Sequence, residues 1–190
     1  MRSSHLFNLA FFLLAQKSVL STKLNVTVLG TANGQSRFEC WELAAPFVSS
    51  TQPGVIGTHT TNLGDVSNIT YNVAPAGYDS EVHTAPFNHY AYINCDRWVL
   101  LLQGLGVITL PCDNSTEVVL TPGEAGLMFV TDTADVSMEG HGSYFPGVTE
   151  TIFLQIPAEG NKVPDHSVVY EHEPCTPNEY AGLRGWATNA

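Results

Sequence analysis

Short apolar segments, each ended by glycine, proline, asparagine or aspartate, recur along most of the chain. β-Branched and aromatic residues dominate these segments, and no part of the chain keeps the 3.6-residue period of an amphipathic helix. The pattern therefore predicts an all-β protein. The expected strands are residues 24–29, 38–43, 67–73, 89–93, 98–103, 107–110, 117–120, 127–131, 136–138 and 151–156.

Two of these regions indicate how the strands are buried. In the first, Ile69, Tyr71 and Val73 alternate with polar residues, which is typical of a strand with one buried face. In the second, residues 98–110, two apolar runs meet at Gly104, which is typical of a hairpin or a sharp corner in a doubly buried wall. Many short strands at this spacing predict a closed barrel or a two-sheet jelly roll, because a flat sheet would leave long unpaired edges.

The two ends of the chain differ from this central region. Residues 1–21 combine a basic start with an apolar run about half as long as the ~20 residues of a membrane-spanning helix, which is typical of a secretory signal peptide. Residues 158–190 are polar and rich in proline. We therefore expect a signal peptide (1–21), a single β-barrel domain (22–157) and a C-terminal extension (158–190) that lies on the barrel.

Composition favours a secreted, extracellular protein whose partners are neither nucleic acids nor membranes. The formal net charge is −11, and loss of the basic leader would make it more negative, so phosphate backbones and anionic lipids are repelled. Three N-x-S/T sequons are expected to be exposed glycosylation sites, at Asn25, Asn68 and Asn114.

Four cysteines follow the leader, and in an oxidising compartment they are expected to form two disulfides, for which three pairings exist. We expect a bond between Cys40 and Cys175, which would tie the first strands to the C-terminal extension. Cys95 and Cys112 flank a candidate hairpin and form the second expected pair. No two cysteines have the CxxC spacing of a zinc or redox site.

Three histidines in the central region are candidates for chemistry. His83 and His89 lie six residues apart, and His141 lies between Gly140 and Gly142. Imidazoles on neighbouring strands can bind Fe, Mn, Cu or Ni, and a single imidazole can also move protons near neutral pH without a metal. A histidine beside proline or glycine is also common in surface loops that have no special role. His83 and His141 are the stronger candidates, because apolar strand signals meet proline or glycine beside them.

Two acids and several aromatic residues complete the candidate site. Asp132 and Asp135 precede His141 and can act as general bases, ligate a metal or simply form a turn. Aromatic residues on strands line pockets or fill cores, and those expected in the pocket are Tyr92, Trp98 and Phe129. The chain has no GxSxG elbow, phosphate-binding glycine loop or HExxH motif, so hydrolase, nucleotide and zinc-protease chemistry lacks support.

The chain resembles the cupins, small β-barrels whose two motifs place metal-binding histidines inside the barrel. More narrowly, it resembles a group of small secreted cupin-like proteins of filamentous fungi in the segments NGQSRFECWELAAPF, LGDVSNITY, HTAP, LLQGLGVITLP, GLMFVTDTADVSMEGH and ETIFLQIP. The resemblance covers residues 24–157. It implies a single-domain cupin-type jelly-roll β-barrel and, since cupins often pair through edge strands, a homodimer.

The resemblance also implies which residues form the site. It places His83 in the first cupin motif and His141 in the second, but the glutamate of the first motif is missing. Arg97 or Trp98 stands near that position, and Arg97 would repel a metal. About eight additional residues around HYAYINCD leave the alignment open: His89 either completes a three-histidine metal site or lies outside it. The cysteines of the second expected pair both lie outside the family pattern, which also favours their pairing.

Two functions of different classes follow. The first is an enzyme acting on a small organic molecule in the barrel. Without a cofactor, His83 or His141 would act as acid or base, assisted by Asp132 or Asp135, in an isomerisation, cyclisation or elimination. With Fe, Mn, Cu or Ni on three histidines, the chemistry would be metal-dependent oxygenation. The missing glutamate favours the metal-free version. The second function is a secreted, non-catalytic protein that binds a small-molecule ligand or an interaction partner.

Overall fold

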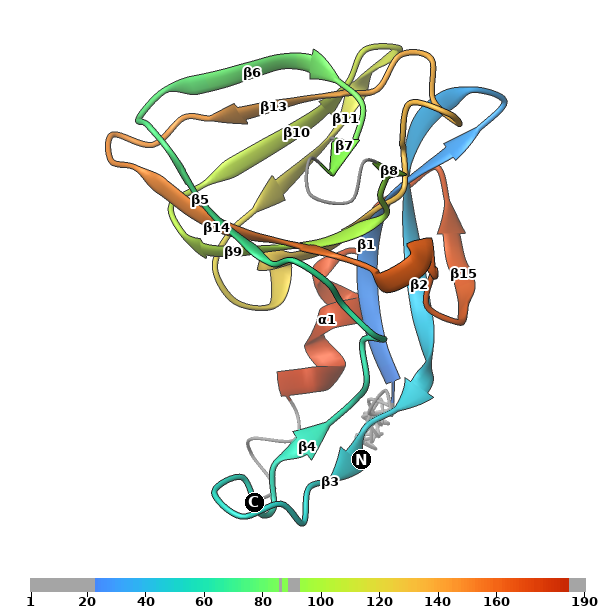
Figure 1. The fold of residues 1–190 in the computed structure, drawn as a ribbon, viewed down its shortest axis with the longest axis vertical. Coiled ribbons are helices and arrows are strands. Elements are labelled where there is room, and N and C mark those ends of the chain that lie inside the picture. Colours follow the sequence, from blue (N-terminus) through green and yellow to red (C-terminus); the bar gives the residue numbers. More distant parts are fainter. Residues whose placement is uncertain (1–22, 86, 89–92, 185–190) are drawn as a thin grey trace, which may run out of the picture.

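The computed structural model describes residues 23–85, 87–88 and 93–184 and shows an all-β protein (Figure 1). A seven-stranded sheet has the order β15-β2-β1-β12-β9-β14-β5, and a four-stranded sheet has the order β11-β10-β13-β6. The large sheet contains β1 (Lys23–Ala32), β2 (Gln35–Pro46), β5 (Thr70–Ala74), β9 (Arg97–Gln103), β12 (Leu127–Val130), β14 (Thr151–Pro157) and β15 (His166–Glu171). The small sheet contains β6 (Tyr78–His83), β10 (Gly106–Leu110), β11 (Asp113–Leu120) and β13 (His141–Phe145).

Smaller elements connect and extend the two sheets. They are the strand pairs β3 (Val48–Ser49) with β4 (His59–Thr60) and β7 (Phe87–Asn88) with β8 (Ile93–Asn94), the 3-10 turns at Glu124–Gly126 and Glu159–Asn161, and helix α1 (Pro177–Arg184). The β3–β4 pair extends away from the sheets at the bottom of Figure 1. Within the described ranges, no helix has the length and apolar content that crossing a membrane requires.

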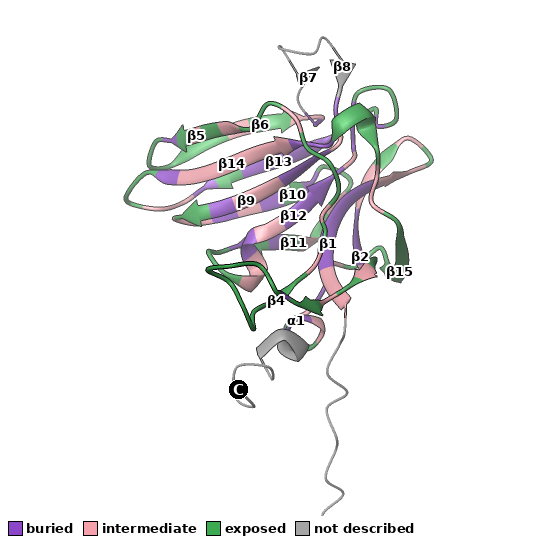
Figure 2. Cartoon of the chain, turned by 60° about the horizontal axis from the view of Figure 1, so that its bottom comes forward, coloured by how far each residue is buried: buried purple, intermediate pink, exposed green. Residues whose placement is uncertain are grey.

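The two sheets face each other across a common apolar core. Leu29, Leu101 and Met128 come from the large sheet, Ile108 and Leu120 come from the small one, and all five are buried in one cluster. Figure 2 shows buried residues along strands of both sheets, whereas the edge strand β15 is exposed. Burial of this apolar surface is the main stabilising contribution to the sandwich.

A second apolar cluster lies on the opposite face of the large sheet. Trp98 and Phe129 are fully buried there, with ring centroids 4.6 Å apart. The Trp98 indole N–H donates to the Leu63 carbonyl at 3.1 Å, so the connection before β5 covers this cluster. Both aromatic side chains therefore fill the core and do not face the space between the sheets.

Most of the expected strands are confirmed, with ends shifted by a few residues. The strand expected at residues 136–138 is wrong, because Val136 and Ser137 donate their backbone N–H groups to the Thr133 carbonyl and form a turn. The expected strand at 89–93 lies largely outside the described residues. Strands β6, β13 and β15 were not expected. The hydrogen-bonded pairing of the described strands leaves two open sheets and does not close them into a barrel.

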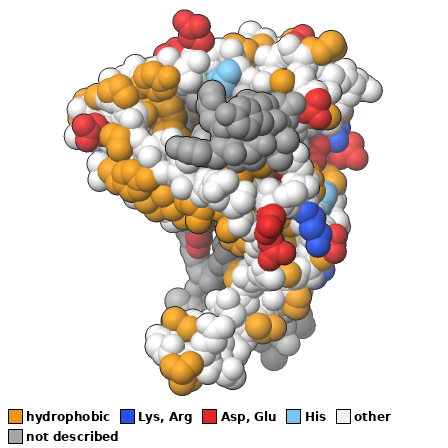
Figure 3. Space-filling view, viewed as in Figure 1, with side chains coloured by type: hydrophobic (Ala, Val, Ile, Leu, Met, Phe, Trp, Pro, Cys, Tyr) orange, Lys and Arg blue, Asp and Glu red, His pale blue; other side chains and the backbone are white. Residues whose placement is uncertain are grey.

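Strand β5 reverses the burial expected for its segment. Ile69, Tyr71 and Val73 are 56%, 62% and 51% exposed. The polar residue between the last two, Asn72, is half-buried and donates to the Phe153 carbonyl at 3.4 Å. Hydrophobic side chains accordingly gather on the molecular surface around β5, β14 and β9 (Figure 3). The strand lies at the edge of the large sheet, where alternation alone does not determine which face is buried.

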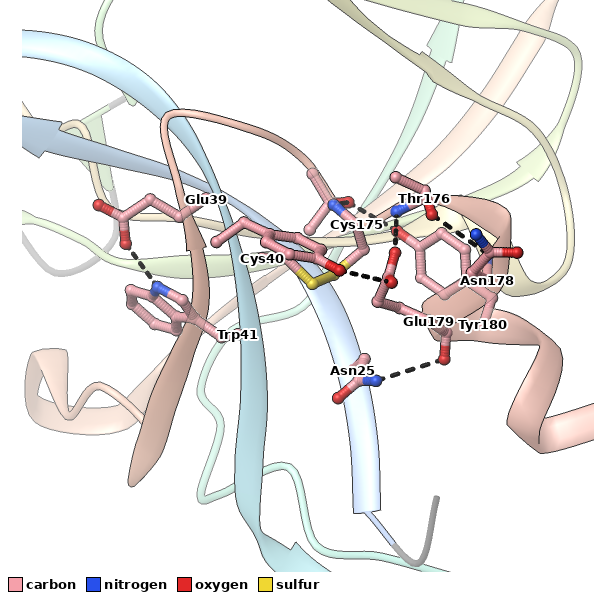
Figure 4. The surroundings of a disulfide bond; sticks show 11 residues. Asn25, Glu39, Cys40, Trp41, Cys175, Thr176, Asn178, Glu179 and Tyr180 are labelled. Atoms are coloured by element: carbon pink, nitrogen blue, oxygen red, sulfur yellow. Dashed lines mark hydrogen bonds between the residues drawn. A yellow bond between two sulfur atoms is a disulfide. The ribbon is translucent and has the colours of Figure 1, made fainter. Parts of the chain in front are cut away.

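The C-terminal region is attached to the large sheet by backbone pairing and by a disulfide. Strand β15 pairs with β2, and the expected Cys40–Cys175 bond is confirmed (Figure 4). The second expected bond is wrong. The buried Cys95 thiol lies against the Asp96 and Ala158 carbonyls, whereas Cys112 is exposed and its thiol bonds to Glu139, so the two sulfurs lie in separate surroundings.

The three sequons differ in accessibility. Asn68 and Asn114 are exposed, as expected. Asn25 is not: its Oδ1 is buried, and its Nδ2, the atom that would carry a glycan, donates to the Glu179 carbonyl of α1 at 3.3 Å (Figure 4). A glycan on Asn25 and this position of α1 therefore exclude each other.

Candidate functional site

A cavity of about 210 Å³ lies between the two sheets. Apolar side chains from both sheets form most of its wall, including Met128 and Phe153 from the large sheet and Ile108 from the small one. Polar side chains also line it, and those relevant to chemistry are Ser80, His83, Arg97, His141, Ser143 and Gln155. The structure thus brings His83 and His141, far apart in the sequence, to the same cavity.

Glycines on both sides of His141 allow its strand to pass close to its neighbours. His141 pairs with His83 across β13 and β6. Gly140 has a φ of 69°, and a Cβ at this position would collide with the His83 carbonyl group. A Cβ at Gly142 would lie 2.7 Å from the Thr109 hydroxyl. The glycines therefore permit the close strand contacts that bring the two imidazoles together, with ring centroids 4.5 Å apart.

Asp132 orients the His141 imidazole. Its Oδ2 lies 2.7 Å from His141 Nδ1 and also accepts a hydrogen bond from Ser36 Oγ at 2.8 Å. Asp132 is fully buried. Since a carboxylate only accepts, Nδ1 carries the hydrogen, and Nε2 of the neutral ring keeps its lone pair. Among the described residues, no hydrogen-bond partner occupies Nε2, so this atom is available to a molecule in the cavity.

His83 is held in the same tautomer by a backbone group. Its Nδ1 donates to the Glu81 carbonyl at 3.0 Å and lies 3.3 Å from Ser80 Oγ. Burial lowers the pKa of His83 below its ordinary value, and the nearby His141 lowers it further, while the Glu81 bond and the Asp132 charge oppose this shift. His83 therefore stays neutral and presents a second imidazole acceptor at the cavity.

Arg97 brings a positive charge to the cavity wall. Its side chain is only 3% exposed, and its Nε and Nη1 donate to the Cys95 carbonyl at 3.1 Å and to Gln155 Oε1 at 3.3 Å. Burial lowers the pKa of Arg97, and nearby Cys95, Asp96 and Asp132 oppose that shift. The guanidinium begins from so high a pKa that it remains charged at neutral pH.

The described residues do not make a three-ligand metal site. The imidazoles of His83 and His141 line the cavity. No group of three or more His, Cys, Asp or Glu side chains with metal-binding geometry occurs among the described residues. Neither Arg97 nor Trp98, one of which was expected near the position of a glutamate ligand, ligates a cation. His89, the third expected ligand, lies outside the described residues. The chemistry below therefore uses only protein side chains.

The other candidate residues lie away from the cavity or outside the described residues. Asp135 is exposed in a turn, where its carboxylate accepts from the Thr133 hydroxyl at 2.6 Å, and it does not line the cavity. Trp98 and Phe129 do not line it either, because they fill the core on the other face of the sheet. Tyr92 lies outside the described residues. The expectation that Trp98 and Phe129 line the pocket is therefore wrong.

Arg97 and Gln155 were not expected as cavity residues. A signal for Arg97 existed, since Arg97, Val99 and Leu101 alternate along β9 and all three line the cavity. Gln155 lies between two apolar residues on β14, but nothing in its own segment indicates a partner on another strand.

A larger hollow of about 360 Å³ lies elsewhere, between β11 and the C-terminal region. Its wall contains Thr27, Cys175 and Tyr180, together with prolines and the acids Glu117 and Glu124. None of its described lining residues is a histidine, and the Thr27 and Tyr180 hydroxyls bond to each other at 2.6 Å. We therefore place the candidate site in the smaller cavity, where imidazole nitrogens face open space.

Comparison of the chain with protein-family models, curated proteins and solved structures finds no match. The functional argument therefore rests on the residues of the cavity.

Proposed function

We propose that the protein is a secreted, cupin-like enzyme that transfers protons within a small organic molecule held between its two sheets. The observation that carries this proposal is the buried Asp132–His141 pair, whose 2.7 Å bond orients the imidazole so that its other nitrogen can face the cavity. A histidine held in one tautomer by a buried carboxylate is the usual arrangement of a general base.

The proposed reaction needs no cofactor. His141 Nε2 takes a proton from a carbon next to a carbonyl group, and the electron pair of the broken C–H bond moves into an enolate. The Asp132 charge stabilises the imidazolium that forms. Return of the same proton to another atom of the enolate gives an isomer, so atoms and electrons balance. With a leaving group or an internal electrophile in the substrate, the same base would support elimination or cyclisation.

The architecture and the compartment belong to the same proposal. Two facing sheets with a polar group inside support a cupin-type jelly roll. The Cys40–Cys175 disulfide supports an oxidising, extracellular location, with glycans on Asn68 and Asn114. A homodimer formed through edge strands is the proposed assembly, and the exposed apolar face of β5 is available for it.

The test uses two enolisable probes, neutral phenylacetone and anionic phenylpyruvate, in deuterated buffer. NMR follows the exchange of the proton next to the carbonyl group. We expect the purified protein to accelerate exchange of at least one probe, and His141→Gln to reduce that rate by at least about 100-fold. His59→Gln, which changes an exposed histidine, is the matched control and should leave the rate unchanged.

Two outcomes would contradict the proposal. If His141→Gln exchanges as fast as the unmodified protein, His141 is not the base. If a probe binds in the cavity without any accelerated exchange, the non-catalytic small-ligand-binding function replaces the enzyme.

A further inference from the structure

The first sequon of the chain lies on β1, beneath the C-terminal helix. An N-x-T sequon is read through its asparagine amide and its threonine hydroxyl, here those of Asn25 and Thr27. Asn25 Nδ2 donates to the Glu179 carbonyl of α1 at 3.3 Å (Figure 4). The Thr27 hydroxyl bonds to the Tyr180 hydroxyl at 2.6 Å. Both groups that define the sequon are therefore occupied by α1 in this structure.

The contact between Asn25 and α1 is incomplete. Among the described residues, Asn25 Oδ1 is buried without a hydrogen-bond partner. An unpaired buried acceptor is unfavourable, and release of the helix would return this oxygen to water. Beside the contact lies the hollow of about 360 Å³, whose wall includes Thr27, Pro177 and Tyr180. The helix is thus the less closely fitted part of the C-terminal region.

The residues before α1 are attached independently of this contact. Cys175 is bonded to Cys40 of β2, and β15 pairs with the same strand. The helix begins with a capping box, in which the Thr176 hydroxyl accepts from the Asn178 N–H at 3.2 Å and Glu179 Oε2 accepts from the Thr176 N–H at 2.6 Å. Release of α1 from β1 therefore leaves the disulfide and the strand pairing in place.

The order of synthesis leaves Asn25 uncovered before α1 exists. Glu179 follows Asn25 by 154 residues. At about 5–20 residues per second, this separation corresponds to roughly 8–30 s of synthesis. A glycan is bulky and polar, and its bond to Nδ2 would lie where the Glu179 carbonyl lies in the docked form. A glycan added in this interval would therefore be in place before the helix could dock.

We infer that Asn25 is a glycosylation site whose glycan determines the position of α1. A chain without this glycan docks the helix as in the structure. A chain with the glycan keeps the helix released, so that the Thr27–Tyr180 bond is absent and the hollow loses Pro177 and Tyr180 from its wall. This inference rests on the secretory location that the proposed function includes, but it does not depend on the proposed catalysis.

The experiment compares the full chain from a glycosylating eukaryotic host with the same chain from the bacterial periplasm. Both carry Asn68→Gln and Asn114→Gln, so that Asn25 is the remaining sequon. Mass spectrometry measures amide hydrogen exchange of residues 176–184. We expect exchange at least about 10-fold faster in the glycosylated form, because a released helix of eight residues is marginal in water.

The matched control is Asn25→Gln, prepared in the same two hosts with Asn68 and Asn114 intact. Its glycans lie on the two exposed sequons only. Amide exchange of residues 176–184 should then be the same from both hosts. The comparison within one variant separates the effect of a glycan at Asn25 from the effect of the substitution.

Three outcomes would overturn the inference. The first is equal amide exchange of residues 176–184 with and without a glycan on Asn25. The second is glycosylation of Asn68 and Asn114 in the unmodified sequence with none on Asn25. The third is the absence of glycans from all three sequons, which would also contradict the secretory location. Loss of the enzyme proposal, with no substrate exchange that depends on His141, leaves the expected helix release unchanged, so the two proposals fail separately.

Discussion

Buried polar side chains meet in two separate groups, and the two groups serve different purposes. Near the start of β1, Thr27 meets Cys175 and Tyr180 of the C-terminal region, and we name this group the closed end. After the end of β12, Asp132 meets His141 of β13 beside the cavity, and we name this group the cavity end. Both groups are well shielded from solvent.

The two ends differ in how completely their polar atoms are paired. At the closed end, the Thr27 hydroxyl accepts the Cys175 N–H at 3.1 Å and bonds to the Tyr180 hydroxyl at 2.6 Å, and the neighbouring Cys40–Cys175 disulfide fixes the arrangement (Figure 4). At the cavity end, every hydrogen bond between the described residues and the two imidazoles is made through Nδ1. Mutual pairing stabilises the fold, whereas an imidazole nitrogen directed at a cavity is available for binding or proton transfer.

The largest expected effect is on stability, at the closed end. Cys40→Ser with Cys175→Ser removes a crosslink between residues 135 positions apart, which should lower the free energy of unfolding by about 3–5 kcal/mol. Thermal and denaturant unfolding measure this loss. Cys112→Ser, at an exposed thiol outside the disulfide, is the control and should unfold like the unmodified protein. Loss of ligand binding in the folded Cys40/Cys175 double variant would show that the two ends are coupled.

The next effect is on catalysis, at the cavity end. Asp132→Asn keeps an acceptor for His141 and Ser36 but removes the charge that stabilises the imidazolium. The exchange rate should fall at least about 100-fold. Asp135→Asn, at the exposed acid three residues later, should leave the rate unchanged. If both variants lower the rate equally, the role of Asp132 is not specific.

The contrast between the ends also explains what the sequence could predict. Apolar periodicity predicted the strands of the central core, because burial of their side chains depends mainly on local patterns. The same pattern failed at β5, where the inward face of an edge strand is determined by its neighbour β14. Strands β6 and β13 were not expected, since their short segments are mixed in polarity and take their pairing from each other.

The sequence indicated some residues of the candidate site and not others. His141 was indicated by the glycines beside it, and Asp132 was named among the acids before it. The alternation along β9 could have identified Arg97 as an inward residue. Its partner Gln155 depends on the pairing of β9 with β14, which no local pattern contains. The Cys95–Cys112 expectation failed because flanking a hairpin in the sequence does not bring two side chains together.

A smaller effect tests the pairing at the closed end. Tyr180→Phe removes the hydroxyl that bonds to Thr27, and Thr27 keeps its bond from Cys175. The free energy of unfolding should fall by about 1 kcal/mol, and the melting temperature by roughly 2–4 °C. Tyr170→Phe, whose hydroxyl bonds to Glu179 at the surface, should have no measurable effect. Equal losses in both variants would contradict the special role of the buried pair.

The smallest expected effect is a pH-dependent change in stability that arises from Asp96. The pKa of Asp96, which lies next to Arg97, is raised from 3.8 to about 6, mainly by burial and in part by nearby Asp135, while Arg97 opposes the shift. Between these values the folded state holds a proton that the unfolded state has released, so stability falls as pH rises through this window and is constant above it. Asp96→Asn should remove this loss.

We expect Asp96→Asn to raise the free energy of unfolding by at most about 1 kcal/mol at pH 8, since Asp96 is partly exposed, and to have little effect at pH 3.5. Urea unfolding at both pH values measures the difference. Asp135→Asn should give a weaker gain over the same pH range, whereas the Tyr180→Phe loss should not change between pH 5 and pH 8, because burial raises the pKa of Tyr180. A gain in Asp96→Asn that is equal at pH 3.5 and pH 8 would show that it does not arise from this carboxyl group's charge.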